Sequence, residues 1–457
     1  MNLNRPLAWR TAGGDAAAML HQLQPNILKP HVRDHLCVLL LRFDDGPEGR
    51  AFLKSLVKLM KSARRQLVET DRFKKSKIPG TPYVGVGLSH QGYIALDVAG
   101  AKRPADRSFR RGMRDPVTLK AVSDPPVSTW EAPYRDRIDA IVLVGDRRAA
   151  SVAARRREVK ARLPDSVTVV GEETGVGYRN REKNGIEHFG YVDGRSQPLF
   201  LVEDLEEERS KTDGITVWDP ECPLRQLIVP DRGAPNPSQH FGSYLVFRKL
   251  EQNVRRFKEQ EEHLADQLKL PKKERERTGA MLVGRFEDGT PVTLQSGEGA
   301  HSPVMNDFTY ASDERGMKCP HYAHIRKVNP RGKRAGDRRH LMARRGQTYG
   351  VRHDDISKDL APSRRPVGGV GLLFMAFNAS LSRQFEHMQK LANSPGPPER
   401  ATDGVDPIIG QGPRGKIESP TSWGGEDVES TDPVAQAVTM KGGEYFFMPT
   451  LEFLKRL

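Results

Sequence analysis

The order of apolar segments in the first half of the chain limits its fold more than any other feature. Four strand-like and two helix-like segments follow one another in the order strand, helix, strand, strand, helix, strand. In chain order they lie at 36–43, 51–67, 83–98 (a strand and a turn), 139–145, 149–163 and 166–175. This order predicts a ferredoxin-like α+β unit, in which helices cover an antiparallel sheet.

The second half repeats these elements less clearly. We expect a strand at 242–247, a highly charged helix at 250–270 and a buried central strand at 368–377. The Pro- and Gly-rich stretch 394–425 has no periodicity and predicts a long surface loop, while 442–454 predicts a last strand and a short helix. A chain of 457 residues has room for two or three domains.

Charge and hydropathy narrow the class of protein. The 73 Lys and Arg residues exceed the 59 Asp and Glu residues, which gives a formal net charge of +14 and favours anionic partners. Nucleic acid is not expected among these partners, because aromatic residues are not interleaved with the basic runs as a base-stacking surface requires. The apolar runs are far shorter than the ~20 residues that span a bilayer, so we expect no transmembrane anchor.

Cysteine content and the N-terminal residues bear on location. The chain has 3 cysteines, which fits a reducing compartment and no disulfide framework. No export signal is recognised in the first residues, so we expect a cytoplasmic protein. The sequence leaves the oligomeric state open, and a homo-oligomer is compatible with it.

Asp193 lies in a glycine-rich stretch that reads HFGYVDG. An Asp-Gly pair is typical of a plain turn. The functional alternative is that the carboxylate acts as an acid–base group, because a partly apolar wall of aromatic residues raises a carboxyl pKa toward working pH.

Cys319 begins the run CPHYAHIRK, which contains two histidines. A structural zinc site is disfavoured here, because no fourth ligand lies nearby and Cys37 and Cys222 are remote in sequence. Three interpretations of a histidine in this run stay open: a surface residue, a catalytic base, or a single axial ligand to haem iron.

Two further stretches bear on chemistry. The run RRGQTYG, which begins at Arg344, is either a basic loop that contacts phosphates or the source of one guanidinium aimed into a pocket. Such a guanidinium stays protonated and stabilises the oxyanion that develops as an O–O bond breaks. The apolar run at 368–377 predicts a strand with one face in the core and one face free to line a cofactor.

Taken together and in order, these stretches resemble the dye-decolorising peroxidases, a family of haem enzymes. The similarity extends from LQPNILKPHVRDHLCVLLL through EHFGYVDGRSQP, AHIRKVNPR, RRGQTYG and DPIIGQG to GGEYFFMPTLEFL, and so covers nearly the whole chain. It implies two tandem ferredoxin-like α+β domains, at residues 1–220 and 221–457, with haem b in the second. It also implies reduction of hydrogen peroxide and oxidation of dyes, phenols or other small organic donors through an oxoferryl intermediate.

The resemblance implies roles for individual residues at the haem. His324, in AHIRK, is expected to be the axial iron ligand, and Asp193, in GYVDG, the acid–base residue on the opposite side. Arg344 is expected to be the arginine on the peroxide side, because the family's arginine stands two positions before the glycine of that motif. Leu372 and Phe374, in GLLF, are expected to form the wall of that pocket.

The partner of the His324 ring is left open between two carboxylates. Glu386, in the helix-like stretch SLSRQFEHMQKL, and Asp406, before PIIG, are both candidates to accept a hydrogen bond from the imidazole N–H. Such a bond would give the ring imidazolate character and favour high-valent iron.

The sequence departs from the family pattern in two places. Arg195 follows GYVDG where apolar residues are more usual, and Gln347 and Thr348 replace the apolar–Pro pair often found before the final Tyr-Gly. Both departures bear on the polarity of the pocket and on substrate access. Basic residues near the entrance would attract anionic dyes or carboxylates.

One functional alternative is a protein that binds or delivers haem with little turnover, which would need His324 but not Asp193 and Arg344. If the protein is a peroxidase, bulky dyes that cannot enter a small pocket must be oxidised at the surface. Trp423, Tyr349 and Tyr445 are unranked candidates to relay the electron.

Overall fold

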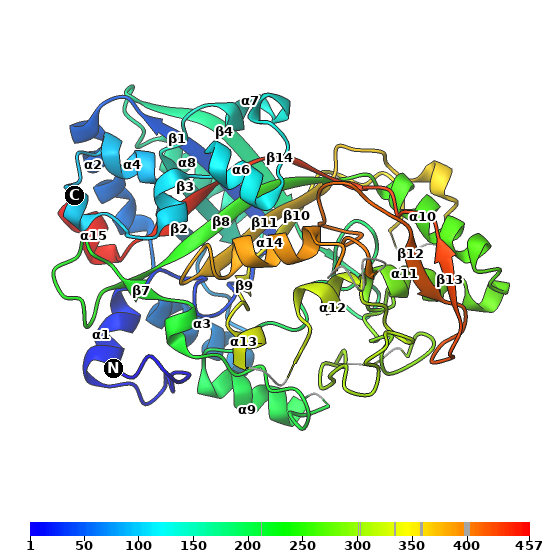
Figure 1. Cartoon of the computed structure of the whole chain (residues 1–457). Helices are drawn as coiled ribbons and strands as arrows, with labels where there is room; N and C mark the ends of the chain where they lie inside the picture. The colour runs from blue at the N-terminus through cyan, green and yellow to red at the C-terminus, as the bar shows by residue number, and fades with distance from the viewer. Residues whose placement is uncertain (212, 300, 302, 333–334, 357–359, 397–402) are drawn as a thin grey trace.

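The computed structural model describes residues 1–457 except 212, 300, 302, 333–334, 357–359 and 397–402. Two antiparallel sheets, one from each half of the chain, organise the described part (Figure 1). The first sheet contains β1 (His35–Phe43), β2 (Tyr83–Leu88), β3 (Ala140–Asp146) and β4 (Val167–Val176). The second contains β8 (Phe241–Gln252), β10 (Gln347–Tyr349), β11 (Gly371–Asn378) and β14 (Val438–Met448).

The two sheets have the same topology. The spatial order is β4-β1-β3-β2 in the first sheet and β14-β8-β11-β10 in the second, and every pair of neighbours is antiparallel. Numbered within each half, both orders are 4-1-3-2, the arrangement of a ferredoxin-like unit. The predicted α+β fold with two ferredoxin-like units is therefore confirmed.

The sheets join at both of their edges. Tyr349 of β10 pairs with Gly175 of β4, and Phe447 of β14 pairs with Leu88 of β2. The eight strands thereby close into one ring. At each of the two junctions, the edge strand of one sheet is paired with the edge strand of the other and is not open to another chain. Because β4 ends at Val176 and β8 begins at Phe241, the boundary at residues 220 and 221 falls between the sheets and stays a prediction.

Helices surround the ring of strands. In the first half they are α1 (Gly14–Gln22), α2 (Gly46–Leu56), α3 (Ala63–Ser76), α4 (His90–Ala95), α5 (Arg107–Arg111), α6 (Pro116–Val122), α7 (Ala132–Arg135), α8 (Ala149–Lys160) and α9 (Val202–Lys211). In the second half they are α10 (Val254–Gln267), α11 (Glu276–Val283), α12 (His324–Val328), α13 (Ala335–Arg338), α14 (Phe385–Asn393) and α15 (Leu451–Arg456). Although it comes last in the chain, α15 packs against α2, as Figure 1 shows in red beside blue.

Short strands complete the described structure. Two of them, β7 (Val229–Pro230) and β9 (Ala343–Arg344), pair with β8 and β11 of the second sheet, respectively. The others form the separate pairs β5 (Tyr178–Arg179) with β6 (Gly185–Ile186) and β12 (Ile417–Pro420) with β13 (Val428–Thr431).

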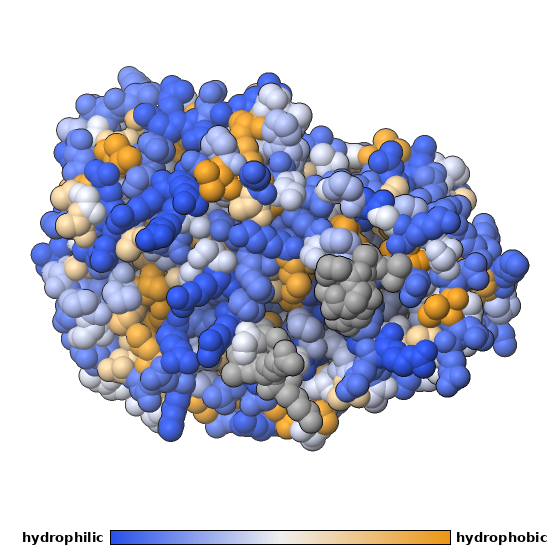
Figure 2. All heavy atoms as spheres, viewed as in Figure 1, coloured by the Kyte–Doolittle hydropathy of each residue, from blue (hydrophilic) through white to orange (hydrophobic). Residues whose placement is uncertain are grey.

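The face of the molecule seen in Figure 2 is mostly hydrophilic. Hydrophobic residues appear on it as small, separate groups, which is ordinary for a folded domain. Among the helices that the structure describes, none combines the length and the apolar composition that a membrane crossing requires.

The helix predicted at 51–67 is in fact two helices. The first, α2, ends at Leu56, and α3 begins at Ala63 after a short 3₁₀ turn. The Ser62 hydroxyl accepts a hydrogen bond from the Arg65 N–H and so caps the new helix. Lys61 turns inward instead of continuing a helix, and its Nζ lies 2.6 Å from Glu69 Oε2.

Two predictions for the second half were wrong at their boundaries. The strand predicted at 242–247 continues as β8 to Gln252, so the helix predicted from residue 250 begins only at Val254, after Asn253 caps it through the Arg256 N–H. The predicted loop 394–425 contains β12, which pairs with β13, while its residues 397–402 lie outside the described part. The final strand and helix are confirmed as β14 and α15.

Candidate active site

A cavity of about 230 Å³ lies between the second sheet and the helices that cover it. Strands β8 and β11 form one wall, and α12, α14 and residues 408–411 face them. Residues 187–196, which precede β8 in the chain, contribute at one end. The volume is many times the ~10–15 Å³ that one water needs, so the cavity has room for a sizeable ligand.

Strand β11 supplies the two residues predicted for the cavity wall. Leu372 and Phe374 line the cavity, whereas Leu373 and Met375, on the other face of the strand, are completely buried in the core. Successive side chains on a strand point to opposite faces, which explains this division. Strand β8 contributes in the same way through Leu250.

His324 lines the cavity from the first turn of α12. Its Nδ1 lies 2.8 Å from Oδ2 of Asp406. Burial raises the pKa of the Asp406 carboxyl, but His324 and two backbone amides outweigh it and hold that pKa below its usual range. A carboxylate accepts, so Nδ1 carries the proton and Nε2 is the nitrogen left for a ligand.

Asp406 itself is fixed by its own segment. It has no exposed surface, and its Oδ1 accepts the backbone N–H groups of Ile408 and Ile409 at 2.8 and 2.9 Å. The alternative partner, Glu386, instead accepts the Tyr445 hydroxyl at 3.3 Å. The structure therefore pairs the imidazole with Asp406, a choice that the sequence left open.

Arg344 lines the same cavity from the end of β9, which pairs with β11. Its Nη2 donates to the Arg195 carbonyl at 3.1 Å, and its backbone N–H donates to Gln197 Oε1 at 3.1 Å. The neighbouring Arg345 is buried, and its guanidinium donates to the carbonyls of Asn26 and Ile27. Arg344 is therefore the arginine of this pair that faces the cavity.

Asp193 lies at the end of the cavity on an exposed loop. Its backbone N–H donates to the Gly185 carbonyl at 2.9 Å, and its Oδ1 accepts the Gly194 N–H at 2.6 Å. Gly190 and Gly194 adopt φ values of 105° and 85°, which residues with a side chain rarely adopt. The two glycines thus let the chain turn on both sides of the carboxylate.

Glu187 fastens this loop and was not identified from the sequence. Its carboxylate accepts the N–H groups of Phe189 at 2.8 Å and Tyr191 at 3.1 Å, and the Gln252 side chain also donates to it. Burial raises the pKa of Glu187 to about 7 despite these bonds. Glu187 lines the cavity as well, so a carboxyl that titrates near neutrality lies beside the Asp193 turn.

Arg285 and Arg331 are two further cavity residues without a predicted role. Each is about 4% exposed, and their guanidinium groups donate to backbone carbonyls and to Asn306. Within the described residues, no ion pair joins either one to a carboxylate. Burial lowers the pKa of Arg285 to about 9 and that of Arg331 to about 10. Among the described residues, the cavity wall thus holds two buried guanidinium groups that are hydrogen-bonded but form no ion pair with a carboxylate.

The two departures from the family pattern have different consequences. Arg195 lines the cavity, and its Nη1 lies 2.8 Å from Glu208 Oε1, so its charge is partly balanced. Gln347 and Thr348 are buried in β10, and neither is among the residues that line the cavity. The polarity of the cavity is therefore changed by Arg195 and not by the other two.

Comparison with curated proteins identifies close relatives. The multifunctional dye peroxidase DyP2 of Amycolatopsis sp. is 56% identical over 467 residues, and the match covers 100% of both chains. A dye-decolorizing peroxidase of Mycena epipterygia is 29% identical over 454 residues, which cover 90% of this chain and 82% of the relative. No family model matches the chain.

Solved structures lead to the same group. The structure of DyP2 from Amycolatopsis sp. superposes with a TM-score of 0.97 over 100% of both chains. A DyP-type peroxidase of Anabaena sp. is 35% identical and superposes with a TM-score of 0.92 over 98% of this chain and 96% of its own. Fold, cavity and relatives define a peroxidase, an oxidoreductase that acts on hydrogen peroxide. The chain belongs to the dye-decolorising peroxidase family, whose members oxidise dyes with hydrogen peroxide.

Proposed function

We propose that the cavity would hold haem b, with His324 as the residue that would bind its iron, and that Asp193 and Arg344 would act on peroxide in the same cavity. The observation that carries this proposal is the His324–Asp406 pair. The imidazole faces the cavity with Nδ1 held by a fully buried carboxylate, which leaves Nε2 to bind a metal. When bound, haem supplies the electron-transfer chemistry of peroxide reduction and donor oxidation.

The remaining cavity residues fit this group chemically. Leu372 and Phe374 provide apolar contact for a flat macrocycle. Arg285 and Arg331 are buried cations without carboxylate partners, and haem b carries two propionates. An unpaired buried charge is strongly destabilising, so binding of these anions at the arginines would remove an unfavourable term.

Asp193 has the position of the group that moves the proton. Cleavage of peroxide to water requires transfer of a proton from the inner to the outer oxygen. The Asp193 carboxylate lines the cavity on an exposed loop, so it can accept this proton directly or through a water and return it to the leaving oxygen.

Arg344 has the position of the group that stabilises charge. Its guanidinium lines the cavity and is held by the Arg195 carbonyl, and negative charge develops on the leaving oxygen as the O–O bond breaks. A fixed cation beside that oxygen stabilises the transition state more than the ground state.

For bulky anionic dyes, we propose oxidation at the surface through Trp423. Of the three candidate relays, Tyr349 and Tyr445 are buried, with 7% and 0% of their surface exposed, whereas Trp423 is half-buried. Trp423 also packs against the hydrophobic cluster that contains Ala323, the neighbour of His324. Lys318 lies 4.7 Å from the centre of the Trp423 ring, so a cation that attracts an anionic dye is close by.

The test is the visible absorption spectrum of the haem-loaded protein, before and milliseconds after one equivalent of hydrogen peroxide. We expect a Soret band that changes on mixing, and we expect His324→Ala to lose the bound haem. A bound haem whose spectrum does not respond to peroxide would favour the alternative of haem handling. A His324→Ala variant that binds haem normally would contradict the assignment of the axial ligand.

We also propose that the protein works in the cytoplasm. Cys37, Cys222 and Cys319 are all free and buried, which suits a reducing compartment. Cell fractionation of a native producer tests this, and recovery of the activity from the medium would contradict it.

A further inference from the structure

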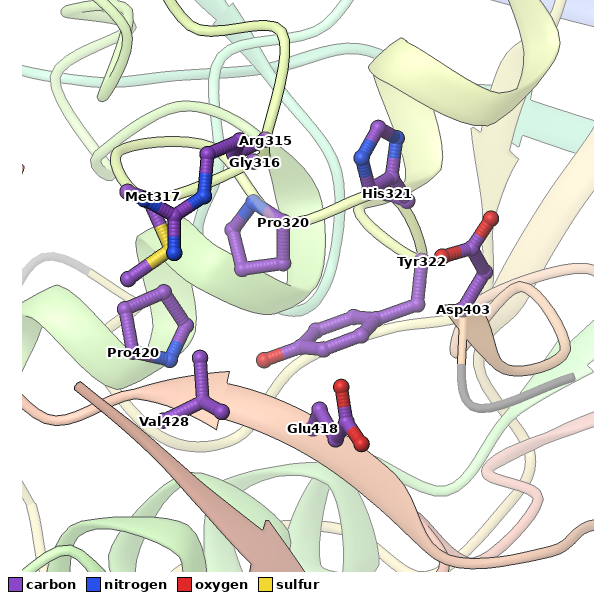
Figure 3. Close-up of a pocket in the computed structure, with 10 residues that line it drawn as sticks. All are labelled: Arg315, Gly316, Met317, Pro320, His321, Tyr322, Asp403, Glu418, Pro420 and Val428. Carbon is purple, nitrogen blue, oxygen red and sulfur yellow. The ribbon is translucent and has the colours of Figure 1, made fainter. Parts of the chain in front are cut away.

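A second, smaller pocket of about 70 Å³ opens on the side of α12 away from the strands of the cavity wall (Figure 3). Met317, Pro320 and Pro420 give it apolar walls, and the ring of Tyr322 lies across it. At ~10–15 Å³ per water, the pocket holds about five to seven waters. That space suits a single aromatic ring and excludes a dye of several rings.

The pocket touches both segments that carry the His324–Asp406 pair. Tyr322 stands two residues before His324, and Asp403 stands three residues before Asp406. Consecutive Cα atoms lie ~3.8 Å apart, so the Cα atoms of Tyr322 and His324 are at most ~7.6 Å from each other. A molecule in the pocket therefore contacts a residue that is separated from His324 by Ala323 alone.

The polar groups of the pocket are arranged for a phenol. Figure 3 shows the carboxylate of Glu418 beside the Tyr322 ring and the guanidinium of Arg315 on the other side of the pocket. Glu418 is exposed, and its side-chain oxygens can accept the hydrogen bond of a phenolic hydroxyl. Tyr322 and Met317 line the pocket but are only 1% and 8% exposed, so they contact a bound aromatic ring over a small area.

We propose that this pocket is a separate binding site for small phenolic electron donors, an inference that rests on the proposed haem site. The donor delivers its electron toward His324 through Tyr322 and the backbone of residues 322–324. The phenol need not enter the cavity in which peroxide reacts, so the phenol and hydrogen peroxide can bind at the same time. The site would serve single-ring donors, whereas bulky dyes would react at Trp423.

The reaction at this site balances as two one-electron steps. Each phenol loses one electron to the peroxide-oxidised haem and one proton to the Glu418 carboxylate, and so becomes a phenoxyl radical. Glu418 then releases the proton to solvent, to which it is exposed. Two phenols reduce one hydrogen peroxide to two waters, with two protons and two electrons taken up.

The decisive variant fills the pocket. Val428 lines it and is 45% exposed on β13, so Val428→Trp can place an indole into the pocket from the surface. The matched control is Val117→Trp, because Val117 is 54% exposed on α6 and is not among the residues that line either cavity. The probe is 2-methoxyphenol, with the haem-loaded enzyme.

Two readouts are measured on wild type and on both variants. Calorimetric titration of 2-methoxyphenol without peroxide should show binding that Val428→Trp weakens at least tenfold and Val117→Trp leaves unchanged. In turnover, Val428→Trp should raise the KM for 2-methoxyphenol at least tenfold, while the rate of the peroxide reaction and the oxidation of a bulky anionic dye keep their wild-type values. Equal behaviour of the two variants in both readouts would overturn the proposal.

Glu418→Gln separates binding from proton transfer. The amide still accepts a hydrogen bond but is a far weaker base, so we expect the kcat for 2-methoxyphenol to fall with little change in its KM. Competition between 2-methoxyphenol and hydrogen peroxide would place the phenol in the main cavity and overturn the proposal.

Failure of this proposal is distinguishable from failure of the proposed function. If the haem spectrum does not respond to peroxide, the proposed function fails, while the calorimetric titration still decides whether the pocket binds a phenol. If peroxide reacts normally but Val428→Trp matches its control, the second donor site alone fails.

Discussion

The two sheets of the molecule share one topology but differ in what their faces contact. In the first sheet, β2 and β3 are buried at every position, because helices or the other sheet cover both faces. In the second sheet, β11 alternates at its start between buried residues and the half-buried Leu372 and Phe374 at the cavity. A ferredoxin-like unit is therefore compatible with a closed core or with a ligand cavity, and side chains on one face decide which.

Because of this difference, we expect the first sheet to contribute mainly to stability and the second sheet to contribute to both stability and ligand binding. Side chains in the first sheet contribute packing, and those in the second contribute packing on one face and a binding surface on the other. A substitution in the core of the first sheet should therefore lower stability without a change at the cavity, whereas a substitution beside the cavity should change ligand binding or reactivity. Four predictions test this separation, from the largest expected effect to the smallest.

The largest effect is expected when a buried leucine side chain is truncated in the core of either sheet. Leu39 of β1 and Leu373 of β11 are both completely buried, so each Leu→Ala change should lower the free energy of unfolding by about 2–5 kcal/mol. Leu39→Ala should leave the haem spectrum unchanged, while Leu373→Ala should alter it, because the neighbouring Leu372 and Phe374 line the cavity. Urea unfolding and absorption spectra measure both. Identical spectral changes in the two variants would contradict the separation.

Removal of the Arg344 guanidinium should lower the rate of the peroxide reaction and leave the fold unchanged. Arg344→Leu should keep the haem and react with peroxide about 10²–10³-fold more slowly, because in the proposed mechanism it removes the positive charge that stabilises the leaving oxygen. Stopped-flow mixing with peroxide measures the rate. Arg339→Leu, at an exposed position five residues earlier in the chain, is the control and should react normally. A normal rate in Arg344→Leu would remove Arg344 from the mechanism.

Loss of the carboxylate behind the imidazole should weaken cofactor binding. Asp406→Asn should lower haem affinity about 10–100-fold, because Asp406 orients the His324 ring through the 2.8 Å contact to Nδ1. Glu386→Gln should have little effect, because Glu386 bonds to Tyr445 and not to His324. The rate of haem transfer to an excess of apomyoglobin compares the variants. The reverse ranking would show that the ring is held by Glu386 in the loaded enzyme.

The smallest effect concerns pH. The pKa of Glu187 is about 7 in the folded protein against an ordinary 4.5, so between these values the folded state holds a proton that the unfolded state has released. Stability therefore falls as pH rises through this range, by about 3 kcal/mol at ~1.4 kcal/mol per pKa unit. Glu187→Gln should lack this contribution, which unfolding of both proteins at pH 4.5 and pH 8 measures. Parallel pH dependence in the two proteins would contradict the raised pKa.

The regular elements were predictable because they rest on local patterns. The apolar runs of β1 and β11 identified strands without any tertiary information. The break before α3 and the start of α10 were missed, although Ser62 and Asn253 are residues that often cap helices. Apolar periodicity continued across both caps, and it outweighed the weaker capping signal.

Site residues were predictable only where they lie within a short sequence motif of the family. His324, Asp193 and Arg344 lie in short stretches of family pattern, and all three line one cavity. The choice of Asp406 over Glu386 required the fold, because 82 residues separate Asp406 from His324. Arg285 and Arg331 were missed because an arginine in a basic sequence gives no local sign of burial.

The closed ring of strands has a consequence for synthesis of the protein. Strand β14 pairs with β8 and also with β2, and α15 packs on α2, so residues 438–457 complete structures begun near the N-terminus. On the ribosome, β2 lacks this neighbour until those residues have emerged. Long-range pairing of this kind delays folding, so a stalled or truncated nascent chain would present an open sheet edge to chaperones and proteases.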